Sequence, residues 1–424
     1  MPGIEQLSAI EVLDSRGRPT VKTTCVLSSG ARASASVPSG ASTGSAEALE
    51  LRDAEPARYR GLGCRRAVEN VNHVLNDHLR RREFAEQADL DAAMTQLDGT
   101  ANKSKLGANT ILSVSLAFAR AAAAERGVPL YQHFADRIAQ PVKTLPRMTV
   151  NLFSGGKHAG GQVPIQDVLV VPVRAATIDE SLATTFAVCQ AAADLLKTKY
   201  DYRPLVADEG GLAPQFDDAD TMLADAVEAI RAAGFEPGMD VSLAVDVAAS
   251  HFFQDGLYHL GAEPLTGARM IEQIARWVQT YPIISVEDGL SEEDWENWPE
   301  LRSALQGRAI TMGDDLLCTN PRRILKAVQT GAADALLLKV NQVGTLTEAA
   351  SANRIARSNG WAVTISARSG ETEDDWLADL AVGWGGDFIK IGSITRSERL
   401  AKYNRLLEVE AETHLPLAGL PPRG

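Results

Sequence analysis

Short apolar segments that contain or end in a charged residue recur through the second half of the chain, and this repeat constrains the fold most. The segments are VSLAVDVAAS, IISVEDGL, AITMGDDL, ALLLKVNQV, AVTISARSG and DFIKIGS. Their charged residues, at successive intervals of 41, 27, 25, 29 and 22 positions, are Asp246, Glu287, Asp314, Lys339, Arg368 and Lys390. Each interval has room for about one strand, loop and helix, so the repeat predicts an α/β fold built as a (β/α)8 barrel.

A doubly wound open sheet could produce the same spacing of strands and helices. In that fold, the ligand usually meets a Gly-rich phosphate-binding turn after the first strand. No G-x-G-x-x-G occurs in that position of this sequence. The barrel is therefore the favoured architecture, and its charged residues should meet where the carboxyl ends of the strands converge.

The first part of the chain follows a different pattern. A length of 424 residues exceeds the usual size of one hydrophobic core, which predicts two domains. The first 60 or so residues favour a three-stranded antiparallel meander, and helical periodicity follows in 64–81 and 108–127. We predict an α+β domain with a lid loop over residues 1–135, a linker in ADRIAQPVKTLPRM, and the barrel over 136–424.

Composition excludes several classes of function. A net charge of −13 disfavours binding to nucleic acid, because that affinity depends chiefly on clustered lysine and arginine. No apolar run reaches the roughly 20 residues of a membrane helix, and no basic leader precedes an apolar segment, so we expect no membrane association and a cytoplasmic location. The cysteines lack a C-x-x-C pair, which argues against a zinc site or disulfide framework: Cys25, Cys64, Cys189 and Cys318.

The three acidic strand ends predict a metal site. Asp246 or Glu287 alone could equally well cap the helix that follows it. Three successive strands ending in Asp246, Glu287 and Asp314 are harder to explain in that way, because barrel closure would bring the carboxylates together. A group of carboxylates without histidine or cysteine suits a hard cation such as Mg²⁺.

The two lysines at later strand ends predict acid–base chemistry. Lys339 could be a residue that extends its amine to solvent from a helix end. Near Lys390 and a bound cation, however, its charged form should be disfavoured, which would lower its pKa and make it a base. We therefore expect Lys339 to remove a proton from a carbon next to a metal-bound carboxylate.

Three loops add further candidates. Glu209 lies in VADEGGLAP, a turn that would present an acid above the barrel. His158 lies in the Gly-rich SGGKHAGG; a single histidine is more often structural, but this loop offers little core for it to join. Ser39 lies in VPSGASTGS, which is either an ordinary surface loop or a lid that excludes water.

These segments resemble the enolase (phosphopyruvate hydratase) family along nearly the whole chain. The matching motifs are VPSGASTG, EALELRD, NKSKLGAN, GGKHAGG, DEGGLAPQ, GDDLLCTN, LLLKVNQVGTLTEA, RSGETED and RSERLAKYN. The resemblance implies a small N-terminal α+β domain and a modified barrel in which an early strand and helix run antiparallel to the rest. It also implies a homodimer and the lysine base beside Mg²⁺ for which the enolase superfamily is known.

The resemblance also implies roles for individual residues. Asp246, Glu287 and Asp314 would bind a first Mg²⁺, and Ser39 would join a second Mg²⁺ that arrives with the substrate. Lys339 would be the base and Lys390 the cation at the substrate carboxylate.

The remaining roles lie on the leaving-group and phosphate sides. Glu209 would assist departure of the hydroxyl, helped by Asp167. Arg368 and Ser369 would bind the phosphate, with His158 nearby.

Several positions depart from the family pattern at the chemistry, and two of them bear most directly on the reaction. The chain has Ala367 in SARSGETED where the family has histidine, and Asp167 in IQDV where it has glutamate. A positioning loss of about 1 Å can cost on the order of 100-fold in rate. We therefore predict a diverged paralogue acting on another small phosphorylated or phosphonylated carboxylic acid, similar to the carboxyphosphonoenolpyruvate synthases of phosphonate biosynthesis. The alternatives are an ordinary glycolytic enolase and a non-catalytic binding protein.

Overall fold

Eight strands close the barrel in the computed structural model, which describes all residues except 1, 42–43, 202, 204 and 424. Around the barrel their order is β10-β11-β12-β13-β4-β5-β6-β9. The strands are β4 (Arg147–Ser154), β5 (Asp167–Val171), β6 (Ser242–Asp246), β9 (Ile283–Glu287), β10 (Ile310–Gly313), β11 (Ala335–Leu338), β12 (Ala362–Ser366) and β13 (Phe388–Gly392). The predicted α/β barrel is confirmed, and the six apolar segments correspond to β6 and β9–β13.

The six apolar segments of the repeat do not include β4 and β5, and the reversed direction of β5 helps to explain this difference. β5 pairs antiparallel with both β4 and β6, whereas the other neighbouring strands are parallel. Because β5 is reversed, its first residue, Asp167, lies opposite Asp246, the last residue of β6. The acid of β5 therefore begins its strand instead of ending it. The expected early antiparallel strand is confirmed.

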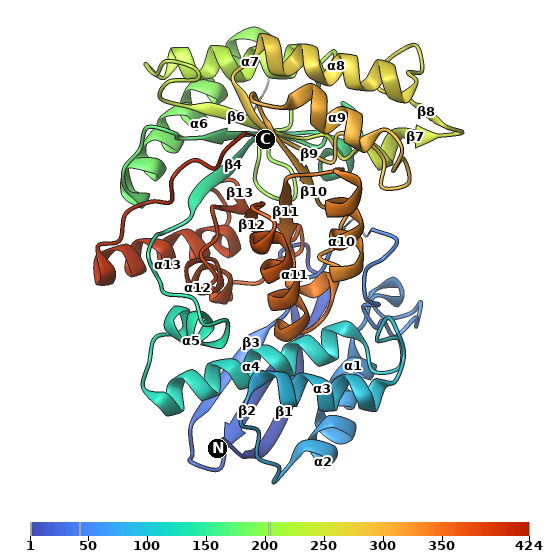
Figure 1. The fold of residues 1–424 in the computed structure, drawn as a ribbon, viewed down its shortest axis with the longest axis vertical. Helices are drawn as coiled ribbons and strands as arrows, with labels where there is room; N and C mark the ends of the chain where they lie inside the picture. The colour runs from blue at the N-terminus through green and yellow to red at the C-terminus, as the bar shows by residue number, and fades with distance from the viewer. Residues whose placement is uncertain (1, 42–43, 202, 204, 424) are drawn as a thin grey trace.

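Helices surround the barrel and cover its outer face (Figure 1). They are α6 (Ile178–Tyr200), α7 (Ala219–Ala232), α8 (Gly267–Thr280), α9 (Trp298–Leu305), α10 (Pro321–Thr330), α11 (Leu346–Ser358), α12 (Trp376–Gly383) and α13 (Ser397–Thr413). In α8, Met270, Ile274 and Trp277 recur at helical spacing and are buried against the barrel core. A second apolar cluster fills the barrel interior, where Ile310, Leu337 and other inward residues pack. The interior is therefore solid, and chemistry is confined to its mouth.

Short elements connect these helices and strands. The single turns of helix are η3 (Gly156–Ala159), η4 (Ala249–Phe252) and η5 (Val340–Gln342), and a two-stranded ribbon is formed by β7 (Phe253–Gln254) and β8 (Leu257–Tyr258). η5 directly follows Lys339, so the chain turns sharply just after this residue.

The N-terminal domain contains the predicted meander, with β1 (Ile4–Leu13), β2 (Pro19–Leu27) and β3 (Arg32–Ser36) in antiparallel order. Its helical segments are η1 (Tyr59–Gly61), α1 (Arg65–Glu69), η2 (Asn70–Leu75), α2 (Asn76–Leu79), α3 (Gln87–Asp98), α4 (Ala108–Arg126) and α5 (Leu130–Arg137). α4 crosses the sheet, joined by a 2.7 Å hydrogen bond between the hydroxyls of Thr23 and Ser113. It ends at Gly127, whose φ of 64° suits glycine.

The two domains meet beside the mouth of the barrel. Ser39, in the loop after β3, pairs through its backbone with Gly370, which follows β12. Residues 42–43 of the predicted lid loop lie outside the described part of the chain.

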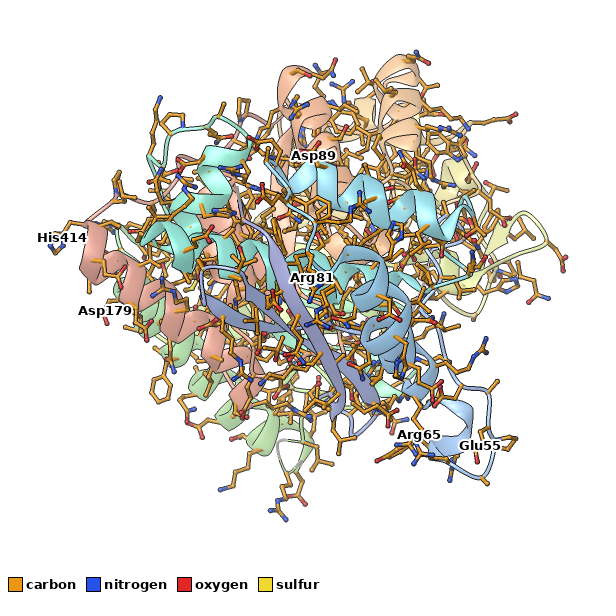
Figure 2. All side chains as sticks on the ribbon, turned by 90° about the horizontal axis from the view of Figure 1, so that it is seen from below. Glu55, Arg65, Arg81, Asp89, Asp179 and His414 are labelled. Carbon is orange, nitrogen blue, oxygen red and sulfur yellow. The ribbon has the colours of Figure 1, made fainter. Side chains whose placement is uncertain are left out.

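Charges of both signs cover the N-terminal side of the molecule. In Figure 2, Glu55, Asp89 and Asp179 lie spread over this view together with Arg65 and Arg81. Among the described residues, none of the helices combines the length and the apolar character needed to span a bilayer.

Candidate active site

Asp246 and Glu287 face each other at the mouth of the barrel. They are register partners at the ends of the parallel strands β6 and β9. The Lys390 ammonium, on β13, lies 2.8 Å from Asp246 Oδ2 and 2.7 Å from Glu287 Oε2. All three side chains are buried. The barrel thus brings together three predicted residues from three strands, with the lysine bridging the two acids.

Asp314 and Lys339 form a second ion pair beside the first. The Lys339 ammonium donates to Asp314 Oδ2, and the Gln342 side chain donates to Asp314 Oδ1 over 2.8 Å. Asp314 is close enough to Glu287 for its charge to raise the Glu287 pKa. The Lys339 amine therefore faces the acidic group, as the role of a base requires.

The expected lowering of the Lys339 pKa assumed a bound cation; the charges of the protein alone raise this pKa instead. Burial has the largest influence and lowers this pKa, and Arg368 and Lys390 act in the same direction. The carboxylates of Asp314 and Glu287 outweigh them, so the pKa is raised. The sequence-based expectation counted the cations near the Lys339 amine but not the carboxylates around it. For Lys339 to act as a base, the negative charge of these carboxylates must be neutralised.

Asp288 was missed by the sequence analysis and organises the acidic turn after β10. Its two carboxylate oxygens accept hydrogen bonds from the backbone N–H groups of Asp314, at 2.9 Å, and Asp315, at 2.7 Å. Among the described residues, the carboxylate oxygens of one acidic group lie close enough together to share a metal ion: Asp288, Asp314 and Asp315. Because Asp288 already accepts two N–H groups, it holds Asp314 in place. Its position directly after Glu287 was the available signal.

The acidic residues fit a divalent cation. Glu287 Oε1 is buried and has no hydrogen-bond partner within the described part of the chain. Burial, together with Asp246 and Asp314, raises the pKa of Glu287 well above its ordinary value. A buried carboxylate oxygen without a donor, among further carboxylates, matches the oxygen ligands that Mg²⁺ prefers. Asp246, Glu287 and Asp314 would hold such an ion once their oxygens draw closer together, since the groups of described residues already close enough to share an ion are Asp288–Asp314–Asp315 and His158–Asp167–Glu209. Gln166 would orient Asp246 through its 3.0 Å hydrogen bond.

This fit predicts stabilisation by Mg²⁺. At 100 times its Kd, Mg²⁺ should raise the free energy of unfolding by about 2.7 kcal/mol, measured as an upward shift of the thermal midpoint that EDTA reverses. Glu287→Gln should remove most of this shift, because an amide is a weaker ligand than a carboxylate. The matched control is Glu263→Gln, at an exposed position. An equal shift in Glu287→Gln and wild type would contradict the assignment.

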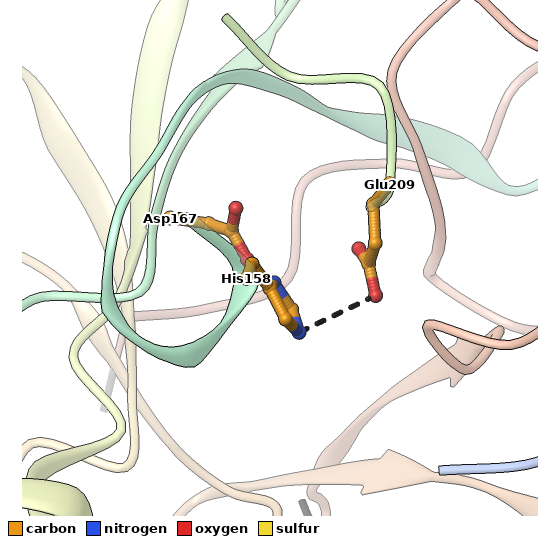
Figure 3. Close-up of side chains that lie close together, drawn as sticks. All are labelled: His158, Asp167 and Glu209. Atoms are coloured by element: carbon orange, nitrogen blue, oxygen red, sulfur yellow. Dashed lines mark hydrogen bonds and ion pairs between the residues drawn. The ribbon is translucent and has the colours of Figure 1, made fainter. Parts of the chain in front are cut away.

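His158, Asp167 and Glu209 form a buried group on the other side of the mouth (Figure 3). His158 Nδ1 lies 3.0 Å from Asp167 Oδ2, and His158 Nε2 lies 3.7 Å from Glu209 Oε1. Ser154 donates to Asp167 Oδ1 over 2.5 Å, and Asn151 donates to Glu209 Oε2 over 3.1 Å. The shorter acid at position 167 is thus held firmly and reaches His158.

Proton affinities differ within this group. Burial lowers the pKa of His158, but the charges of Glu209 and Asp167 outweigh it and raise the pKa to about 9. Burial raises the pKa of Glu209, but His158, Arg399 and Lys390 outweigh it, so that pKa is lowered. At neutral pH the histidine is therefore the proton carrier and Glu209 is ionised.

Arg368 and Ala367 follow β12 at the rim of the site. The Arg368 guanidinium forms a 3.0 Å ion pair with Glu47 of the N-terminal domain and donates to Asn341 Oδ1 over 2.9 Å. The Ala367 backbone donates to the Lys390 carbonyl over 2.8 Å. Sequence reasoning missed Glu47 and Asn341, although Asn341 stands two residues after Lys339.

Ser39 and Ser369 lie where the two domains meet. The Ser39 hydroxyl donates to Glu50 over 3.1 Å and accepts from Arg52 over 2.8 Å, so it faces these residues. The Ser369 hydroxyl accepts from Arg16 over 3.1 Å. Contacts of Ser39 with a second metal ion, and of Ser369 with phosphate, stay predictions.

Comparisons with known proteins agree along nearly the whole chain. Residues 4–134 match the family description "Enolase, N-terminal domain", and residues 142–415 match "Enolase, C-terminal TIM barrel domain". A curated relative, "Enolase 1" of Methylococcus capsulatus, is 45% identical over 412 residues, which cover 96% of this chain and 97% of that protein.

Proposed function

Because this chain belongs to the enolase family, whose members are lyases, we propose that it removes water from 2-phosphoglycerate to give phosphoenolpyruvate in a Mg²⁺-dependent reaction. The observation that carries the proposal is the assembled group His158–Asp167–Glu209 together with Lys339, which follows β11, four strands away around the barrel from the β5 strand of Asp167. An elimination needs a base on one side of the substrate and a proton donor on the other. The 45% identity to a protein named Enolase 1 supports the same reaction.

The reaction would proceed through two proton transfers. Lys339 takes the proton from the carbon next to the carboxylate, and the proton held by the His158–Glu209 pair passes to the departing hydroxyl, which leaves as water. Mg²⁺, when bound by Asp246, Glu287 and Asp314, would neutralise the acids around Lys339 and stabilise the negative charge that develops on the substrate. Lys390 would compensate the substrate carboxylate, while Arg368 and Ser369 would hold the phosphate, with Glu47 displaced from Arg368 or sharing it.

A second candidate function is favoured by Ala367. Alanine in place of the family histidine removes a hydrogen-bond donor and a ring next to Arg368, a change that would suit an additional group on a phosphorylated or phosphonylated acid. This is the paralogue predicted from the sequence, similar to carboxyphosphonoenolpyruvate synthase. The identity to Enolase 1 and the 3.0 Å contact of Asp167 with His158 favour dehydration as the first candidate.

A direct assay separates the two candidates. For an ordinary dehydratase, purified protein with Mg²⁺ should convert 2-phosphoglycerate with kcat in the range of about 1–10³ per second, followed as the ultraviolet absorbance of the enol product. Ala367→His should then change kcat by less than about tenfold, because the site already works without the imidazole. Wild-type turnover below this range, together with a gain of about 100-fold in Ala367→His, would favour the paralogue instead.

Asp167→Glu provides the matched control for the other departure. It restores the family residue at the position that contacts His158, and its added methylene must fit against Ser154. If dehydration is the native reaction, this variant should not exceed wild-type kcat by more than a few-fold. A large gain would mean that the native site is built for another substrate.

Assembly and location are also proposals. We propose a homodimer, supported by the exposed apolar side chains of Ile10 and Leu13 on β1, which are 60% and 54% exposed. Sedimentation equilibrium would test it, and a monomer at micromolar concentration would contradict it. A cytoplasmic location is supported by the four cysteines being free thiols.

A further inference from the structure

A cavity of about 390 Å³ lies where the helices of the N-terminal domain meet α11 and the end of α12. Figure 1 shows α11 standing over α3 and α4, with α5 and α12 beside them. The volume falls within the roughly 300–1,000 Å³ of small-molecule sites. None of its lining residues belongs to the catalytic group described above.

One wall of the cavity is apolar and rigid. Phe134, Trp384 and Leu346 line it and are 2%, 2% and 3% exposed, respectively. The rings of Phe134 and Trp384 pack edge to face, with centroids 6.4 Å apart. Because these side chains are almost wholly buried, they form a rigid backing for the wall, and the apolar surface open to a ligand belongs to the half-buried Ile138 and Ala350.

The rim of the cavity is cationic in an otherwise acidic protein. Arg354, on α11, has no side-chain hydrogen bond or ion pair with any other described residue. Arg137 pairs with Glu86 over 2.5 Å, but the Glu86 side chain is 64% exposed, so water weakens this pair. Glu86 is the one acid among the described lining residues. One cation is therefore left without a counter-charge.

The positive charges near the cavity also affect the pKa of His133. It is buried in the cavity wall, and burial, followed by the charges of Arg137 and Arg126, lowers its pKa to about 4. At neutral pH it is uncharged and does not add to the cationic rim. A ligand would meet the guanidinium groups as the positive charges.

We propose that this cavity binds a small organic anion with a flat apolar body, in its simplest form an aryl carboxylate, whose carboxylate pairs with Arg354 and whose ring packs against Ile138 and Ala350, which Phe134 and Trp384 support from behind. Inorganic phosphate would satisfy the charge but leave the apolar wall uncovered. A neutral aromatic molecule would cover the wall but leave Arg354 without a counter-ion. The amphipathic anion satisfies both surfaces.

Such a ligand would bridge the two domains close to an existing contact. Asp91 of α3 accepts hydrogen bonds from the backbone and hydroxyl of Thr347, at 3.0 and 2.6 Å, near the start of α11. Thr347 also lines the cavity. Binding should therefore hold the N-terminal domain more firmly against the barrel helix that follows Lys339.

The test uses the full chain with Mg²⁺ and saturating 2-phosphoglycerate, so that the catalytic site is filled. Naphthalene-2-carboxylate is titrated and followed by saturation-transfer NMR. We expect saturable binding, and binding of naphthalene-2-methanol weaker by about tenfold or more, because it lacks the charge. No saturable binding, or equal affinity for the alcohol, would overturn the proposal.

Three variants locate the site. Arg354→Glu should weaken naphthalene-2-carboxylate binding by about tenfold or more by reversing the charge, and Ser351→Phe should do so by filling the cavity without changing charge. Arg322→Glu, at an exposed position on α10, is the matched control and should bind as wild type. Wild-type affinity in both cavity variants, or an equal loss in the control, would overturn the assignment. Circular dichroism confirms that each variant is folded.

Discussion

Lys339→Met is expected to lower kcat for the proposed dehydration by about 10³-fold or more and to abolish solvent deuterium exchange at the α-carbon of 2-phosphoglycerate. The reason is that Lys339 is the amine facing Asp314 and Glu287, where the α-proton would be removed, and a positioned base contributes about 10²–10⁴-fold. Methionine keeps the length of the side chain but cannot accept a proton. Exchange is measured by NMR of recovered substrate, and kcat by ultraviolet absorbance.

Two controls make this result specific. Lys143→Met removes an exposed lysine in the segment before β4 and should leave kcat and exchange unchanged. The Mg²⁺-dependent thermal shift should persist in Lys339→Met, because the carboxylates remain. Deuterium exchange at the wild-type rate in Lys339→Met would mean that another group takes the α-proton, and the assignment of the base would be withdrawn.

Glu209→Gln separates the two halves of the reaction. Dehydration should fall by about 10²–10⁴-fold, because the neutral amide no longer stabilises the protonated His158, whose Nε2 lies 3.7 Å from the Glu209 carboxylate. Exchange of the α-proton should survive within about tenfold, since Lys339 follows β11, four strands away around the barrel from β5. Both quantities are measured in the same reaction, one by absorbance and one by NMR.

The control for Glu209→Gln is Asp208→Asn, the acid immediately before it in the same turn. A loss of dehydration in both variants would indicate that the turn, and not the Glu209 carboxylate, is what matters. If Glu209→Gln loses exchange and dehydration together, Glu209 acts before proton removal, and the division of roles proposed here is wrong.

Much of the barrel could be predicted from the sequence because its parallel strands appear as apolar segments at regular intervals along the chain. Each buried strand is an apolar run, and each parallel strand delivers its last residue to the same mouth. Asp246, Glu287 and Lys390 are therefore predictable as neighbours, and the structure joins them in one ion-pair group. The antiparallel strand β5 breaks this rule, which is why the place of Asp167 beside Asp246 follows from its register and not from the spacing.

Electrostatics at the site could not be read in the same way. A list of cations around Lys339 predicts a lowered pKa, yet the carboxylates of Asp314 and Glu287 raise it. The pKa of a side chain depends on which charges lie nearest to it in space and on how deeply it is buried. Neither can be predicted from the spacing of residues in the sequence.

The amino-acid sequence by itself determined the architecture, the family and the kinds of residue at the mouth of the barrel, because hydrophobic periodicity and residue order are local properties of the chain. Only the tertiary structure decided how those residues are partnered: Asp288 with the backbone of Asp314, Asp167 with His158, and Glu47 with Arg368. These contacts join segments up to 321 positions apart. Their distances are set by the closure of the barrel and the docking of the N-terminal domain, which no local pattern encodes.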